Sequence, residues 1–186
     1  KWSLGLRLPD STGADIERAI ADKQIVRTWL WRGTLFLTTV DDVRWMLELV
    51  ADRIIAQSQR RYRELELDAA TLIRANDILV QALADGQQRS RRQLYAILEE
   101  HGISTKGQRG VHIVRHTSLE GLIVQGTVNK NDPVFMCLDD VPSTAQTMPK
   151  EVALAELARR YFTSRGLATL HDFAWCSGLL MLDVRA

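Results

Sequence analysis

The side chains best suited to chemistry in this sequence are basic and amide groups concentrated in one stretch. Between Arg89 and His116 there are six basic residues and only two acidic ones. Several polar positions in it are three or four residues apart, so a helix places them on one face: Gln108, Arg109, His112, Arg115 and His116. Such groups donate hydrogen bonds to phosphates, and Arg and Gln also read the edges of bases. The stretch predicts a DNA-binding face, with a solvated polar face as the alternative.

The elements expected to position this face follow the order of a winged helix. Capping residues and apolar periodicity predict helices over 68–84, 91–100 and 108–120, and strands over 122–128 and 133–138. The third helix would be the recognition helix and the strand pair the β-wing. We therefore expect further DNA contacts from the same stretch and from the tip of the wing: Arg89, Arg92, Lys106 and Lys130.

The flanking segments repeat parts of this order. Segment 1–58 predicts a short helix capped by Ser11 or Thr12, two strands joined by a tight turn at Arg32-Gly33, and a helix ending near Ile55. Segment 150–186 predicts two helices and the start of a third, after a polar linker. The predicted fold is α+β, mainly α, with tandem winged-helix domains: a complete one over 59–141 and partial ones over 1–58 and 150–186.

Composition sets the broad class. The chain has 186 residues, 46% of them hydrophobic, with 24 basic and 23 acidic side chains, which excludes a disordered chain. It contains no apolar run of the roughly 18 residues that a membrane span needs and no signal peptide. Cys137 and Cys176 are too few for a disulfide framework, so we expect buried thiols in the cytoplasm. Both ends look internal, so we expect a piece of a longer protein.

Several enzyme classes are excluded because their motifs are missing. The sequence has no Gly-rich phosphate loop and no G-x-S-x-G elbow. His171 precedes Asp172, but no Ser or Cys is placed to complete a catalytic pair, so a helix start is expected there. His112 and His116 have metal-binding spacing without a Glu or Cys partner. We expect neither a metal site nor a cofactor.

Three segments together resemble one family. Arg27–Leu35 reads R-T-W-L-W-R-G-T-L, similar to the R-T-W-L-x-R-G-T-L-H segment of the AlkZ-like winged-helix DNA glycosylases. Residues 107–116 resemble the middle-domain helix of that family, and residues 165–179 resemble its third-domain signature. The segments occur in the family order and span nearly the whole chain.

The resemblance implies a concave surface that binds double-stranded DNA, with Arg32 near the reaction channel, and hydrolysis of the N-glycosidic bond of alkylated or crosslinked bases. It implies no metal or organic cofactor. The Gln-x-Gln (or Gln-x-Asp) catalytic pair of the family would precede Lys1, so no catalytic residue is expected in this chain. Gln57-Ser58-Gln59 follows the R-T-W-L segment instead of preceding it. Phe36 also stands where the family commonly has His.

Two other classes of function remain open at this stage. One is a non-catalytic winged-helix transcription regulator that uses the same helix to read sequence, and the other is a protein-interaction module. A dimeric regulator needs self-association and half-sites related by a two-fold axis. Several non-identical modules in one chain favour a monomer instead. Whether the protein is an enzyme depends on the upstream Gln pair.

Overall fold

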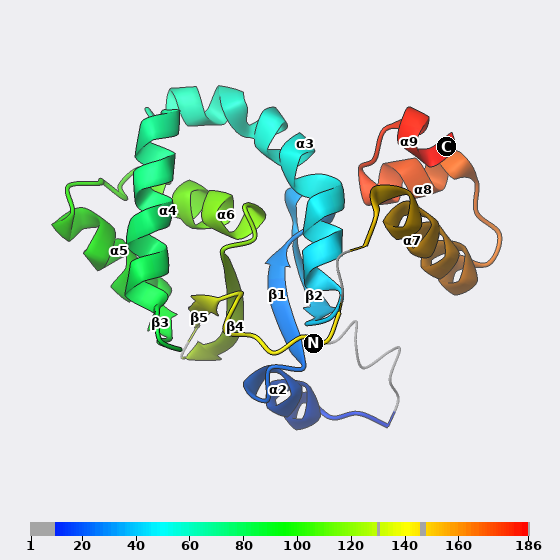
Figure 1. The fold of residues 1–186 in the computed structure, drawn as a ribbon, viewed down its shortest axis with the longest axis horizontal. Helices are drawn as coiled ribbons and strands as arrows, with labels where there is room; N and C mark the ends of the chain where they lie inside the picture. The colour runs from blue at the N-terminus through cyan, green and yellow to red at the C-terminus, as the bar shows by residue number, and fades with distance from the viewer. Residues whose placement is uncertain (1–9, 130, 146–147, 186) are drawn as a thin grey trace.

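The fold is known from a computed structural model, which describes residues 10–129, 131–145 and 148–185. One antiparallel sheet lies at the centre, with helices on both of its faces (Figure 1). The strand order is β2-β1-β4-β5-β3. The elements in chain order are α2 Gly13–Ala21, β1 Ile25–Trp29, the 3-10 turn η1 Trp31–Gly33, β2 Leu35–Thr39, α3 Val43–Glu64, α4 Ala69–Leu83, β3 Arg89–Ser90, α5 Arg91–Glu100, α6 Arg109–Leu119, β4 Ile123–Asn129, β5 Asp132–Cys137, α7 Lys150–Arg165, α8 Leu170–Ser177 and α9 Met181–Arg185. The predicted α+β class is confirmed.

The predicted helix starts are confirmed because their capping side chains are in place. The Thr12, Asp68, Ser90 and Thr169 side chains each accept a hydrogen bond from the backbone N–H three residues later. These bonds satisfy N–H groups that the first turn of a helix leaves without a partner. Local sequence therefore determines where α2, α4, α5 and α8 begin.

The sheet separates two hydrophobic cores. Side chains alternate along a strand, so Ile123 of β4 packs in the core formed with α4, α5 and α6, whereas Val124 packs in the core formed with α3, α7 and α8. Phe135 and Met136 of β5 divide in the same way. The sequence predicted two separate strand pairs in two modules, but β1 pairs with β4 through Arg27 and Gln125. The two predicted modules therefore share one sheet.

Helix α3 is longer than the sequence predicted. It was expected to end near Ile55, but it continues to Glu64 and curves over α6 (Figure 1). The Ser58 hydroxyl donates to the Ile54 carbonyl at 2.7 Å, an arrangement that bends helices. The predicted module boundary between 58 and 59 thus falls inside one continuous helix, with Ile54 in one core and Tyr62 in the other.

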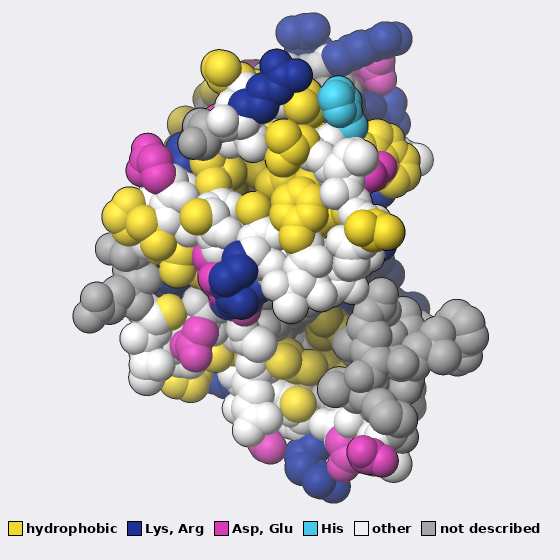
Figure 2. All heavy atoms as spheres, turned by 90° about the vertical axis from the view of Figure 1, so that its right-hand side faces the viewer, with side chains coloured by type: hydrophobic (Ala, Val, Ile, Leu, Met, Phe, Trp, Pro, Cys, Tyr) yellow, Lys and Arg dark blue, Asp and Glu magenta, His cyan; other side chains and the backbone are white. Residues whose placement is uncertain are grey.

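Helices α7 to α9 attach to the start of α3. Asp42 accepts hydrogen bonds from Arg160 of α7 at 2.6 Å and from the Trp45 indole at 3.0 Å. Arg160 also stacks over the Trp45 ring. Figure 2 shows hydrophobic side chains gathered on this side of the molecule. Trp175 of α8 is 73% exposed and Leu182 of α9 is 81% exposed. None of the described helices is both long and apolar enough to span a bilayer.

Candidate nucleic-acid interface

The turn before α6 presents polar side chains to solvent. Lys106 and Gln108 are exposed there, and Gln108 has a left-handed backbone with φ of 74°. The Gln108 side-chain oxygen accepts a hydrogen bond from Arg61 of α3 at 2.8 Å. The predicted contacts Lys106 and Gln108 are thus joined at this end of α6 by Arg61, which the sequence analysis did not identify.

Arg109 has a structural position. Its guanidinium donates to the carbonyls of Leu65 and Glu66, which follow α3, and its Nε donates to the Ser104 carbonyl at 2.9 Å. These acceptors belong to two separate turns, so one side chain ties the end of α3 to the start of α6. These bonds use Nε and Nη1, so only the two N–H groups of Nη2 are left for a phosphate.

The remaining predicted residues of α6 face α3 instead of solvent. His116 is buried, and its ring lies edge-on to Tyr62, with centroids 5.6 Å apart. His112 is half-buried and approaches the same tyrosine. Burial lowers the pKa of both histidines, and Arg115 lowers that of His112 further. The pKa of His116 is lowered despite Glu120, whose carboxylate lies 3.7 Å from its Nε2.

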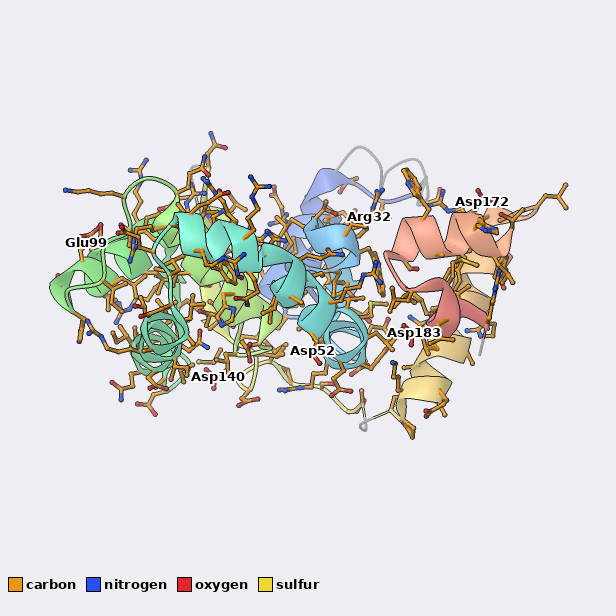
Figure 3. The ribbon with its side chains drawn as sticks, turned by 90° about the horizontal axis from the view of Figure 1, so that it is seen from above. Arg32, Asp52, Glu99, Asp140, Asp172 and Asp183 are labelled. Atoms are coloured by element: carbon orange, nitrogen blue, oxygen red, sulfur yellow. The ribbon has the colours of Figure 1, made fainter. Side chains whose placement is uncertain are left out.

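Arg115 contacts the η1 turn at Gly33, which is 82 residues earlier in the sequence. A β-carbon on Gly33 would overlap the Arg115 Nη2, and Gly33 has φ of 68°. The neighbouring Arg32 extends towards α8, where its guanidinium stacks on the Trp175 ring at 4.3 Å from the centroid (Figure 3). The structure therefore brings two of the motif segments, around Gly33 and around Arg115, into contact.

The other predicted basic residues lie beside the β4–β5 hairpin. Near its tip, Arg92 and the neighbouring Arg91 approach Asp132 at 3.9 and 3.8 Å, and Asp132 is largely buried. Arg89 is half-buried, and among the described residues its Nε has no hydrogen-bond partner. Lys130, predicted at the tip of the wing, lies outside the described residues. The predicted contacts thus form groups at the turn before α6, beside the β4–β5 hairpin and between α3 and α6.

Gln57 and Gln59 do not converge on one site. Both are exposed on α3, whereas Ser58 between them is buried. Residues two positions apart on a helix do not face each other, so the two amides cannot hold one water molecule. Within the described ranges, no group of three or more His, Cys, Asp or Glu side chains is arranged to hold a metal ion. Cys137 is buried and Cys176 half-buried, both as free thiols.

Sequence reasoning missed a pocket of about 310 Å³. Its lining includes Trp29 of β1, Tyr95 of α5 and Gln125 of β4, with Arg91 and Asn131 at its polar positions. These residues come together only through the pairing of β1 with β4, which no local pattern in the sequence indicates.

The comparisons with known proteins agree with the resemblance noted from the sequence. The family described as "DNA glycosylase AlkZ-like" matches residues 1–186. No curated protein matches the chain. The solved structure of the Streptomyces sahachiroi DNA glycosylase AlkZ is similar, with a TM-score of 0.73 and 19% identity, over 91% of this chain and 48% of that one. The chain thus spans about half the length of that structure. Because the family match extends over all 186 residues, the chain belongs to the AlkZ-like DNA glycosylase family.

Proposed function

We propose that this chain is the DNA-binding part of a DNA-repair glycosylase that hydrolyses the N-glycosidic bond of alkylated or crosslinked bases. The observation that carries the proposal is the family match over the whole chain. The water-activating side chains would be a Gln-x-Gln pair preceding Lys1, as general-base and electrostatic catalysis require. Neither a metal ion nor an organic cofactor enters this scheme, and the protein would act as a monomer in the cytoplasm.

The strand pairing supports a winged helix in the middle of the chain. β3 pairs with β5, and β5 pairs with β4, so the order is α4-β3-α5-α6-β4-β5 with β3 at the sheet edge. In a winged helix the third helix enters the major groove and the hairpin contacts the flanking backbone. We assign these roles to α6 and to β4–β5, with partial modules of the same kind on either side.

The exposure of the predicted contact residues divides them into two groups. We propose that the exposed side chains of Lys106, Gln108 and Arg92 contact the phosphates. We also retain the half-buried Arg89 and Lys130, which lies outside the described residues, as proposed contacts. Arg109, His112 and Arg115 instead hold α6 against its neighbours. Arg32 stands at the junction with α8, against Trp175 and Gly178.

The test is release of N7-alkylguanine from duplex DNA by protein that includes the upstream segment. Base release that is lost when both Gln residues of the pair are replaced by Ala supports the glycosylase. A control reaction with Gln57→Ala and Gln59→Ala should keep full activity, because the α3 amides face different directions. Salt-sensitive duplex binding without any base release would instead favour a non-catalytic regulator.

A further inference from the structure

The pocket between the sheet and helices α5 and α6 has the size and lining of a small-molecule binding site. Its volume of about 310 Å³ lies at the lower end of the range for small-molecule sites. Trp29, Tyr95 and Phe135 supply aromatic walls, and Val111 of α6 lies at the rim with 39% exposure. Such walls suit a flat ring system, because aromatic rings stack on planar partners.

The strand register explains why Gln125 lies among these rings. Gln125 pairs with Arg27 on one side and with Phe135 on the other, so the three side chains share one face of the sheet. Trp29 is two residues after Arg27 and lies on the same face. Arg27 does not fill the pocket, because its guanidinium donates to the Gly126 carbonyl at 3.2 Å.

Gln125 is an amide with unused hydrogen-bonding capacity. It is 6% exposed, and no hydrogen bond joins its side chain to any other residue that the structure describes. Its amide atoms are not among the fully buried polar atoms without a partner, so they are accessible from the pocket. Because the Gln125 side chain lines the pocket, a ligand bound there can supply both an acceptor and a donor.

Tyr95 and Arg91 are held beside this amide. A β-carbon on Gly110 would lie 2.7 Å from the Tyr95 Cζ, so the ring packs directly on the backbone of α6. Burial raises the pKa of Tyr95, which keeps its hydroxyl protonated. Arg91 lines the same pocket with its Nε 3.8 Å from the Asp132 carboxylate, and its guanidinium donates no hydrogen bond to any other residue that the structure describes, so an anionic group of a ligand can still bind it.

We propose that this pocket binds a single unstacked nucleobase, with adenine as the best match. A Gln amide can bond N6 and N7 of adenine in a bidentate pair, and Trp29 and Tyr95 would stack on the ring. Arg91 would face the phosphate of the nucleotide. The base comes either from a free nucleotide or from an unpaired position in a bound strand. This proposal goes beyond the binding of duplex DNA proposed above and does not depend on it.

The first arm of the test uses adenosine 5′-monophosphate, with ribose 5-phosphate as the ligand that lacks a base. NMR follows the side-chain signals of Gln125 and Trp29 during titration. Gln125→Leu should weaken binding by about tenfold or more, the size of a lost bidentate base contact. Gln57→Leu is the matched control, since that amide is exposed on α3. Val111→Trp blocks the rim from an exposed position, so it tests the pocket without altering its buried floor.

The second arm places adenine as the only unpaired base in a duplex, with the fully paired duplex as reference. A shift of the Trp29 indole signal that needs the unpaired adenine, and that is lost in Gln125→Leu at equal duplex affinity, identifies the strand as the source. Binding of adenosine 5′-monophosphate without such a shift identifies a free nucleotide. If neither probe distinguishes wild type from Gln125→Leu and Val111→Trp, the nucleobase site is overturned, whatever the duplex affinity.

Discussion

The Arg115 guanidinium lies against the α-carbon of Gly33, so a side chain of α6 contacts the turn between β1 and β2. Both residues belong to segments that carry the family resemblance, although the segments are far apart in sequence. Gly33 is required there for two reasons, because its φ of 68° disfavours other residues and because a side chain would displace Arg115.

Replacing Gly33 by Ala should therefore lower the free energy of unfolding by more than backbone strain alone. A left-handed residue other than Gly costs about 1–2 kcal/mol, and displacement of Arg115 adds to it. Urea denaturation measures the loss. Gly86→Ala is the control, since Gly86 has φ of 73° and nothing within 4 Å of an added β-carbon. Equal losses in the two variants would argue against the Arg115 contact.

Arg109→Met should destabilise the protein, because it removes the bonds to the carbonyls of Leu65, Glu66 and Ser104. We expect the free energy of unfolding to fall by about 1.5–3 kcal/mol, as for a hydrogen bond to a charged group. Chemical denaturation gives the value. An unchanged stability together with weaker DNA binding would show that Arg109 contacts phosphate instead.

Lys106→Met should leave stability within about 0.5 kcal/mol, because the side chain is exposed. Its effect should appear in DNA binding. Loss of one phosphate contact reduces the slope of log K against log salt concentration by about 1. Fluorescence anisotropy with a labelled duplex at several salt concentrations measures this slope. Arg18→Met on α2 is the control, with a side chain 69% exposed, and it should keep the wild-type slope.

The stability of the fold should decrease as the pH falls below about 6.5, the ordinary pKa of histidine. Burial lowers the pKa of His116 in the folded protein, so the unfolded chain takes up the proton first. The stabilising effect is complete above pH 6.5 and is lost as the pH falls through the folded-state pKa. Thermal melts of wild type and His116→Gln between pH 7.5 and 5 test this. Parallel pH profiles would exclude His116 as the cause.

The stacking of Arg32 on Trp175 should couple η1 to α8. Cation–π pairs at exposed positions contribute about 0.5–1 kcal/mol. A double-mutant cycle with Arg32→Gln and Trp175→Leu, followed by thermal unfolding, should give a coupling energy of that size. Additive effects of the two substitutions would indicate that the guanidinium and the indole contribute no interaction energy.

The sequence determined the local elements well and their mutual contacts poorly. Capping side chains such as Ser90 act within one turn of helix, so the local sequence predicts where the helices begin. Helical spacing placed His112 and His116 on one face, but it could not show that α3 continues past Ile55 and covers that face. The pocket around Gln125 was missed for the same reason, because its pairing with Arg27 joins segments that no local pattern connects.

The division of β4 between two cores has a consequence for how the molecule comes apart. Ile123 and Val124 are neighbours, yet each anchors a different core, and the bent α3 also contributes to both. Loss of packing on one face therefore frees the strand that supports the other, so opening cannot stop at the middle of the sheet. Amide protons on both sides of the sheet should exchange with solvent through a shared opening event, and a weakening substitution in either core should accelerate exchange in the two alike.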